Sequence, residues 1–179
     1  MGKIILGVTG SIAAFKAASL ASLMVKKGHD VHAILTSNAC KFVAPLTFQS
    51  ITSNKVVTDM FELSVNFDPS HVSVARDASL LVIAPASANI LSKMACGIAD
   101  DMLSTTCLSV SCPVLVAPAM HAAMWKHPAV SENVKTIESR GIHFAGPAEG
   151  RLASGDNGPG RMSEPEEIAS IVEKLIKSR

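Results

Sequence analysis

KIILGVTGSIAAFKAASLASLMVKKGHDVHAILTS, residues 3–37, is the stretch that decides the fold. Residues 3–10 form a short apolar run that ends in glycine, which is typical of a buried parallel strand. Residues 11–28 open with a serine and close with a glycine, which predicts a helix capped by Ser11. Residues 30–37 are apolar again and predict the next strand. A strand, a helix and a strand in this order form a crossover unit, so we expect a parallel sheet.

The rest of the sequence continues this alternation. A helical stretch after residue 37 is expected to break near Pro45. Further strands are predicted at 80–87, 113–120 and 142–150, and further helices within 88–110, 121–141 and 163–179. The pattern contains no linker and no internal repeat, which indicates one domain over residues 1–179. We therefore predict an α/β fold with a single doubly wound parallel sheet, Rossmann-like or flavodoxin-like, that binds its ligand beyond the carboxyl ends of the strands.

The composition argues against several classes of function. Lys and Arg number 16 against 15 Asp and Glu, and no basic cluster exceeds a pair, so nucleic-acid binding is not expected. No apolar run approaches the roughly 18 residues of a membrane span, and the apolar N-terminus is too short for a secretion signal. The four cysteines form no C-x-x-C pair, which predicts free core thiols in a cytoplasmic protein and no metal site. A hydrophobic content of 48% leaves room for a buried subunit interface.

Two loops at the expected ligand edge have more than one interpretation. In GVTGSIAAFK, residues 7–16, backbone N–H groups and the hydroxyl of Ser11 could hold a phosphate, or the segment could be only a tight turn with a helix cap. The full G-x-G-x-x-G pattern is missing, so a dinucleotide site has little support. In APASAN, residues 84–89, small side chains admit a flat ligand and Ser87 and Asn89 could bond a heterocycle. The same two residues could instead cap the following helix.

Two further features suggest contacts or catalysis. APAMHAAMW, residues 117–125, groups two methionines with the only tryptophan, a combination more typical of a core or of an interface anchored by Trp125. His71 precedes an apolar stretch, where a lone histidine is more often structural. In a chain without tyrosine it is nevertheless the best candidate for a general base near neutral pH.

Six motifs carry a resemblance to a known family: GVTGSIAAFK, SHVSVAR, APASAN, GIADDMLS, PAMHAAMW and RLASGDNGPGRMSEP occur in this order across nearly the whole chain. Together they resemble the flavin-containing cysteine decarboxylases, which include the phosphopantothenoylcysteine decarboxylases of coenzyme A biosynthesis. The resemblance implies a cytoplasmic FMN enzyme that is a homotrimer, or a dodecamer of four trimers, with FMN at the subunit contacts. Because the decarboxylase is often fused to a synthetase domain, we expect either a standalone enzyme or an isolated domain.

The resemblance also implies roles for particular residues. The implied FMN contacts are Gly10, Ser11, Ile12, Thr36, Ser37, Asn38, Ser87, Ala88, Asn89, Ile90 and Ala119. The implied substrate contacts are His121, Met124, Arg151, Leu152 and Ala153. His71 matches the catalytic base of the family. Two positions depart from the family motifs: Ile90 stands in place of a threonine, and His121 in place of an asparagine that binds the substrate carboxylate. An imidazole can donate a hydrogen bond to that carboxylate too.

The reaction that the resemblance implies begins with oxidation of a cysteine-derived substrate to a thioaldehyde. When CO2 leaves, the thioaldehyde accepts the electron pair of the broken carbon–carbon bond. In the coenzyme A enzymes a loop cysteine donates a proton when the resulting enethiolate is reduced. Ser154 stands where that cysteine is expected, and none of the four cysteines lies in this loop. A hydroxyl is a far weaker acid than a thiol, whose pKa is about 8.5. The sequence therefore predicts decarboxylation with a weakened final reduction.

Three functions remain open on these observations. The first is decarboxylation of the small molecule 4'-phosphopantothenoylcysteine, which the GPGRM segment favours. The second is decarboxylation of a peptide's C-terminal cysteine to an aminoenethiol, which Ser154 favours because that reaction needs no cysteine donor. The third is a non-catalytic, FMN-binding regulatory subunit, against which the retained His71 argues. A prenyl-transferring flavoprotein of similar fold is disfavoured, since PASAN and PAMHAAMW are not its signatures.

Overall fold

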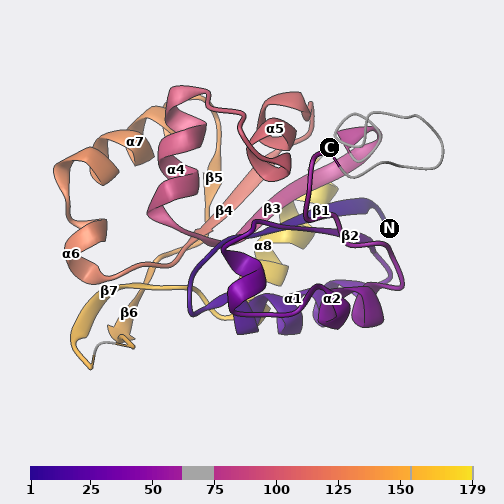
Figure 1. Ribbon diagram of the computed structural model, residues 1–179, viewed down its shortest axis with the longest axis horizontal. Coiled ribbons are helices and arrows are strands. Elements are labelled where there is room, and N and C mark those ends of the chain that lie inside the picture. The colour runs from indigo at the N-terminus through magenta and orange to yellow at the C-terminus, as the bar shows by residue number, and fades with distance from the viewer. Residues whose placement is uncertain (62–74, 154, 179) are drawn as a thin grey trace.

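The computed structural model describes residues 1–61, 75–153 and 155–178, so His71 and Ser154 lie outside the described residues. Its main sheet has five strands in the order β2-β1-β3-β4-β5, all parallel (Figure 1). The strands are β1 (Lys3–Val8), β2 (Asp30–Leu35), β3 (Ala78–Ala86), β4 (Val114–Pro118) and β5 (His143–Phe144). This is the flavodoxin-like strand order, and it confirms the predicted doubly wound parallel sheet.

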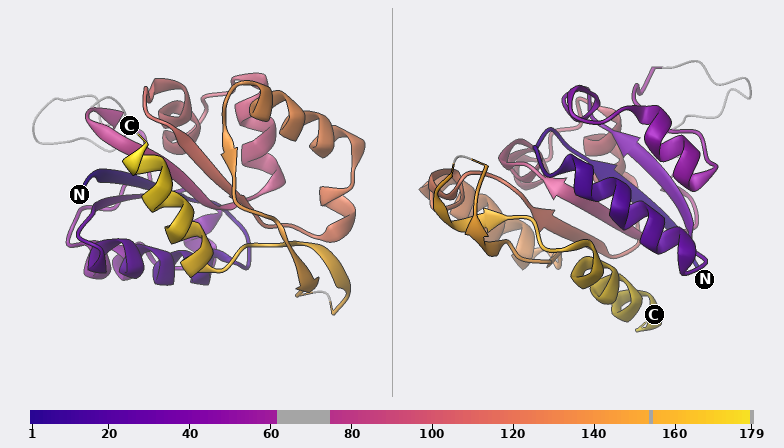
Figure 2. Two further views of the ribbon diagram at one scale, coloured as in Figure 1. Left: turned by 180° about the vertical axis from the view of Figure 1, so that it is seen from behind. Right: turned by 90° about the horizontal axis from the view of Figure 1, so that it is seen from below.

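Helices cover both faces of the sheet (Figure 2). One face carries α1 (Ala14–Lys26), α2 (Pro45–Thr52) and α8 (Pro165–Lys177), and the other carries α4 (Ala88–Cys96), α5 (Met102–Ser109) and α7 (Pro128–Ser139). Short helices η1 (Ala39–Lys41) and α6 (Ala122–Trp125) follow β2 and β4. Each face therefore has its own hydrophobic cluster, as expected for a parallel sheet buried on both sides.

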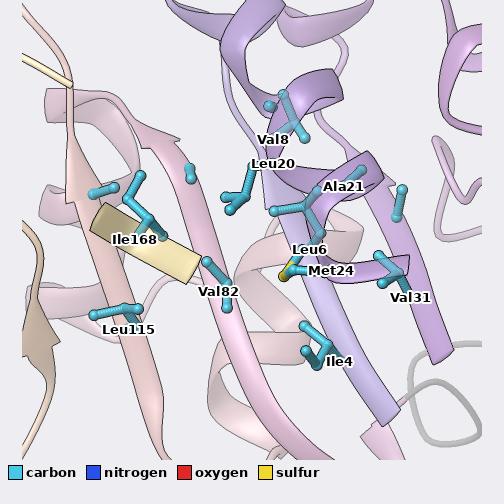
Figure 3. Close-up of a cluster of buried hydrophobic side chains, with 14 of the residues drawn as sticks. Ile4, Leu6, Val8, Leu20, Ala21, Met24, Val31, Val82, Leu115 and Ile168 are labelled. Atoms are coloured by element: carbon cyan, nitrogen blue, oxygen red, sulfur yellow. The ribbon is translucent and has the colours of Figure 1, made fainter. Parts of the chain in front are cut away.

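Strand β1 shows how one sequence serves both clusters. Ile4, Leu6 and Val8 point to the face of α1 and α8, where Figure 3 shows them beside Leu20 and Met24. Ile5 points to the opposite face, as the period of two along a strand requires. Each fully buried aliphatic side chain of this kind stabilises the fold by roughly 1.5–3 kcal/mol.

The predicted helix over 88–110 is two helices. Helix α4 ends at Gly97, whose φ of 71° is in the left-handed region that glycine adopts easily. Helix α5 then begins at a new cap, because Asp101 accepts a hydrogen bond from the backbone nitrogen of Ser104 at 2.8 Å and the Ser104 hydroxyl accepts one from Asp101 at 3.0 Å. This capping box starts α5 as a separate helix after α4 has ended.

Two further predictions are wrong in detail. Ser11 does not cap α1, which begins at Ala14 with Ala13 as its N-cap and no side-chain cap bond. The predicted strand 142–150 enters the main sheet only at β5, and β6 (Ala148–Arg151) pairs instead with β7 (Asn157–Arg161) as an antiparallel hairpin. This hairpin lies beside α6 at one end of the molecule (Figure 1).

The cysteines, possible metal sites and possible membrane helices can now be compared with the expectations from composition. None of the four cysteines, all in the described ranges, forms a disulfide, but Cys96 is exposed rather than in the core. Within the described ranges, no three His, Cys, Asp or Glu side chains are grouped so as to hold a metal ion. None of the helices in the described part of the chain has the length and hydropathy needed to cross a membrane.

Candidate functional site

The candidate site lies where β1 and β3 end side by side. The chain leaves β1 towards α1 on one face of the sheet and leaves β3 towards α4 on the other. Two neighbouring strands whose connections diverge open a crevice at their carboxyl ends, which is where doubly wound sheets bind ligands. Residues 9–13 and Ser87 therefore form the floor of the candidate site.

A buried threonine joins the two diverging loops. Thr9 is 2% exposed, and its hydroxyl donates to the carbonyl oxygen of Pro85 at 2.7 Å and accepts from the backbone nitrogen of Ser87 at 2.9 Å. The backbone nitrogen of Thr9 also donates to the Pro85 carbonyl at 3.3 Å. Sequence reasoning missed this residue because its role depends on a strand nearly eighty positions away.

Two helix N-termini meet at this floor, and neither has a side-chain cap. Helix α1 begins after Ala13 and helix α4 begins after Ser87, without a cap hydrogen bond from either residue. Ser87 thus occupies the N-cap position of α4 while its hydroxyl does not perform the capping role considered for it. At α1 the backbone nitrogens of Ala14 and Lys16 donate to the carbonyls of Ser11 and Ala13 instead. The positive ends of the two helix dipoles favour binding of an anionic ligand at this floor.

Gly10 brings a third loop to the same place. A Cβ at Gly10 would lie 2.5 Å from the Cβ of Asn38, so only glycine allows the loop after β1 to approach the loop after β2 this closely. Thr36 accepts a hydrogen bond from the backbone nitrogen of Ala39 at 3.2 Å, and Asn38 accepts one from Lys41 at 3.0 Å. These local bonds hold the 36–38 segment beside Gly10.

Two adjoining cavities collect the predicted contacts. The smaller, of about 270 Å³, is lined by eight of the eleven residues predicted to contact FMN: Gly10, Thr36, Ser37, Asn38, Ser87, Ala88, Asn89 and Ile90. The larger, of about 500 Å³, is lined by the other three, Ser11, Ile12 and Ala119, and by all five predicted substrate contacts. Gly10, Ser87, Ala88 and Met124 line both cavities, so the two form one continuous site.

An ion-pair cluster that the sequence did not reveal borders the smaller cavity. The ammonium of Lys93 lies 2.6 Å from a carboxylate oxygen of Asp100 and 2.6 Å from one of Asp101. Burial alone would lower the pKa of Lys93, but its hydrogen bonds to Asp100 and then Asp101 outweigh that effect and raise the pKa above its usual value. Lys93 therefore stays charged and ties α4 to the start of α5 at the cavity wall.

The hairpin and α6 form the outer wall of the larger cavity. The backbone nitrogen of Met120 donates to the carbonyl of Gly160 at 2.9 Å, and a Cβ at Gly160 would lie 2.2 Å from the Met120 carbonyl oxygen. His121 caps α6: its Nδ1 accepts from the backbone nitrogen of Ala123 at 3.2 Å, and its Nε2 lies 3.4 Å from a carboxylate oxygen of Asp156. Trp125 is partly buried and packs against the core beneath this wall, which agrees with the expectation of a core position.

The family described as Flavoprotein matches residues 1–177. The chain belongs to this family. It is 46% identical over 171 residues to the coenzyme A biosynthesis bifunctional protein CoaBC of Bacillus subtilis, a match that covers 96% of this chain and 42% of that protein. The chain thus spans less than half the length of the curated relatives it matches.

Solved structures of similar proteins cover the whole fold. A PPC decarboxylase mutant complexed with pantothenoylaminoethenethiol is 31% identical, with a TM-score of 0.88 over 98% of both chains. The FMN-dependent cysteine decarboxylase SpaF is 28% identical, with a TM-score of 0.85 over 99% of this chain and 97% of that one. Both neighbours are named as decarboxylases, and they share the fold of this chain.

The described residues fit the flavin that the family implies. Ala88 and Ala119 have small side chains that leave room for a ring system, and the start of α4, which has no side-chain cap, suits an anionic tail. This part of the fold is therefore the candidate flavin site.

Proposed function

We propose that this chain is an FMN-dependent carboxy-lyase that converts 4'-phosphopantothenoylcysteine to 4'-phosphopantetheine in coenzyme A biosynthesis. The observation that carries the proposal is the site's composition: two cavities that share lining residues contain all the predicted FMN contacts and all the predicted substrate contacts. The near-complete structural match to PPC decarboxylase supports the same reaction. Relatives named for coenzyme A biosynthesis support the pathway.

The FMN would be held by three loops. Gly10, Ser11 and Ile12 would surround its phosphate at the start of α1, and residues 36–38 and 87–90 would hold the remainder, with Ala119 against the ring. When bound, the flavin supplies the two-electron oxidation and reduction that make loss of CO2 possible. The protein's own task is to orient the substrate, exclude water and move protons.

His121 is proposed to bind the substrate carboxylate in place of the family's asparagine. Its Nδ1 accepts the N–H of Ala123, so in the neutral imidazole the proton is on Nε2. That N–H faces a carboxylate oxygen of Asp156 at 3.4 Å. A substrate carboxylate in the larger cavity, next to Met124 and the 151–153 segment, would accept it in place of Asp156. His71 is proposed to remove the proton in the oxidative phase, a role for which the neutral imidazole has a suitable basicity.

The proposed assembly is a homotrimer, alone or four times in a dodecamer, in the cytoplasm. Ile12 and Phe15 are 59% and 60% exposed although both line the larger cavity, and Met124 beside them is 47% exposed. Exposed apolar side chains at the mouth of a ligand cavity suit a surface covered by another subunit. The FMN sites would then lie at the subunit contacts.

A second candidate function is decarboxylation of a peptide's C-terminal cysteine to an aminoenethiol, which Ser154 favours because no thiol stands at that position. The cysteine decarboxylase SpaF shares the fold. A non-catalytic FMN-binding subunit is the third.

One experiment separates these functions. The purified yellow protein is incubated with 4'-phosphopantothenoylcysteine or with a peptide that ends in cysteine, and CO2 release and product mass are measured. A fully reduced product from 4'-phosphopantothenoylcysteine supports the first function. A product lighter by two hydrogens supports an enethiol endpoint. Absence of CO2 with every cysteine substrate would overturn both enzymatic functions and leave the regulatory one.

A further inference from the structure

All ionisable side chains that line the larger cavity, among the described residues, are basic. They are Lys16, His121, Arg151 and Arg161. The remaining lining is apolar or uncharged, so the wall as a whole attracts an anionic ligand. One carboxylate on the substrate accounts for His121 but not for the cations at the other end of the cavity.

Lys16 and Arg161 meet at a shared carboxylate just outside the cavity. The ammonium of Lys16 donates to the two carboxylate oxygens of Glu164 at 2.9 and 3.0 Å, and the guanidinium of Arg161 donates to the same carboxylate. Lys16 is only 14% exposed, so this end of the network is partly shielded from water. The Lys16 ammonium, with Arg161 adding to it, holds the pKa of Glu164 below its usual value, so the carboxylate stays ionised.

Lys16 and Arg161 differ in how many of their N–H donors have a partner. Lys16 directs its N–H groups to Glu164 and, at 3.5 Å, to the carbonyl of Met162. Arg161 donates through one nitrogen to Glu164, and no other described residue accepts a hydrogen bond from it. A guanidinium has five N–H donors in a planar fork, so most of the Arg161 fork remains available at the cavity wall.

Glu164 and the hairpin fix where that fork lies. Arg161 pairs with Ala148 at the base of the β6–β7 hairpin, whereas Arg151 pairs with Asn157 near its tip, beside Asp156 and His121. The four steps from Asn157 to Arg161 span about 13 Å of strand. The backbone on either side of His121 meets Gly160, but the His121 side chain turns towards Asp156 at the tip. The Arg161 fork lies at the base, where Glu164 holds it, so the two cations offer separate contacts for a ligand with two acidic groups.

We propose that Arg161, oriented by Glu164 and Lys16, binds the phosphomonoester end of the substrate and makes the chain prefer the phosphorylated over the dephosphorylated cysteine compound. Lys16 and Glu164 are positioning residues in this subsite, while Arg161 contacts the phosphate. The inference rests on the proposed function, because it places the two acidic ends of that substrate at opposite ends of one cavity.

The test compares two substrates on the FMN-loaded enzyme. For 4'-phosphopantothenoylcysteine and its dephosphorylated analogue, kcat and KM are measured in the unmodified protein, Arg161→Met and Arg161→Lys. We expect a preference of about tenfold or more for the phosphorylated compound, lost in Arg161→Met through a higher KM for that compound alone. Arg161→Lys keeps the charge but not the fork, so it should retain an intermediate preference. The Arg161→Lys variant also tests the inference if the Arg161→Met protein does not fold.

Lys126→Met is the matched control, since Lys126 is an exposed cation next to α6 that does not line the cavity. It should keep the full preference, which would show that the effect is not one of overall charge. Lys16→Met should reduce the preference, because Glu164 would then neutralise Arg161 alone.

Other outcomes separate the possible failures. Equal kcat/KM for both compounds in the unmodified protein, or an equal loss for both in Arg161→Met, would overturn the inference and leave the proposed function standing. No turnover of either compound would overturn the proposed function and this inference with it. Affinities for FMN and riboflavin are measured by flavin fluorescence in the same variants. A loss specific to FMN in Arg161→Met would assign this subsite to the cofactor's phosphate and overturn the inference.

Discussion

The hydroxyl oxygen of Thr9 lies 2.9 Å from the backbone nitrogen of Ser87, and this contact joins the end of β1 to the end of β3. The same hydroxyl donates to the carbonyl of Pro85 at 2.7 Å. One buried side chain therefore sets the spacing of the two loops that carry the uncapped starts of α1 and α4. The geometry of the candidate flavin site depends on this residue, which also lines the smaller cavity.

Replacement of Thr9 by valine should loosen this junction. Valine has the same shape, but it leaves the Ser87 N–H and part of the Pro85 carbonyl without a buried partner, which costs about 1–3 kcal/mol. We expect the free energy of unfolding of the flavin-free protein, measured in urea, to fall by that amount and the affinity for FMN to fall as well. Thr9→Ser keeps the hydroxyl and should retain FMN affinity. A Thr9→Val protein with unchanged FMN affinity would show that the two loops are positioned without this contact.

Gly160 is expected to be required for the outer wall of the larger cavity. Its φ is 136°, and an alanine there would place a Cβ 2.2 Å from the Met120 carbonyl oxygen. Gly160→Ala should therefore push β7 away from the loop before α6 and raise KM for substrate, with a smaller effect on FMN affinity. Gly141→Ala is the matched control, because Gly141 also has a positive φ, 85°, but nothing within 4 Å of the added Cβ. It should cost stability, about 1–3 kcal/mol, and leave KM unchanged. Equal KM effects in the two variants would refute the wall assignment.

The Lys93 cluster should make the stability of the protein depend on pH in the acid range. Burial alone would raise the pKa of Asp101, but the hydrogen bonds from Lys93 and Ser104 outweigh it and lower the pKa. A lowered pKa contributes stability that is fully present above the unfolded value of about 4 and is lost as the pH falls through the folded value.

Asp101→Asn isolates that charge, since asparagine still caps a helix. At pH 7 we expect it to lower the free energy of unfolding by about 1 kcal/mol. This difference from the unmodified protein should shrink as urea unfolding is repeated at pH values below 4. Asp100→Asn, at a carboxylate 60% exposed, should have a smaller effect. A difference that is constant from pH 7 to pH 3 would mean that Asp101 acts only as a cap.

Much of the fold could be predicted because its signals are local. The apolar run of β1, the helix that follows it and the glycine at residue 28 act within a few positions of each other, and the structure has the predicted strand, helix and strand. The β6–β7 hairpin was missed for the opposite reason. NGPGR, residues 157–161, contains no β-branched or aromatic residue. Its sequence therefore predicts a loop, and only the pairing with β6 in the folded chain makes it a strand.

The site was predicted only in part for a similar reason. Residues in short motifs, such as Ser87 and Asn89, were found because the motif itself is recognisable. Thr9, Lys16 and Arg161 were missed because tertiary contacts define their roles, and Lys16 reaches a carboxylate 148 positions away. No period or spacing in one sequence shows such a pair. The positive charge of the larger cavity could not be predicted either, because the residues that line it come from distant parts of the chain.

His71→Asn tests the proposed base. Asparagine can occupy a similar volume but cannot accept the proton, so we expect decarboxylation to fall about 10²–10⁴-fold while the protein stays yellow. CO2 release and the flavin absorption spectrum provide the two readouts. His143→Asn is the control, at an exposed histidine of β5 that lines neither cavity. Activity that survives His71→Asn would remove this residue from the mechanism.

Ser154→Cys tests whether the position lacks only its proton donor. A thiol with a pKa of about 8.5 can protonate the carbon of an enethiolate, and a serine hydroxyl is a much weaker acid. We therefore expect the variant to yield more of the fully reduced thiol from 4'-phosphopantothenoylcysteine, heavier by two hydrogens than an enethiol product. In an anaerobic single turnover, reduction of the product would also leave the flavin oxidised and yellow, whereas an enethiol endpoint leaves it bleached. Ser154→Ala should behave as the unmodified protein if the hydroxyl donates no proton. Identical products from Ser154→Cys, Ser154→Ala and the unmodified protein would show that this loop position does not reach the reacting carbon.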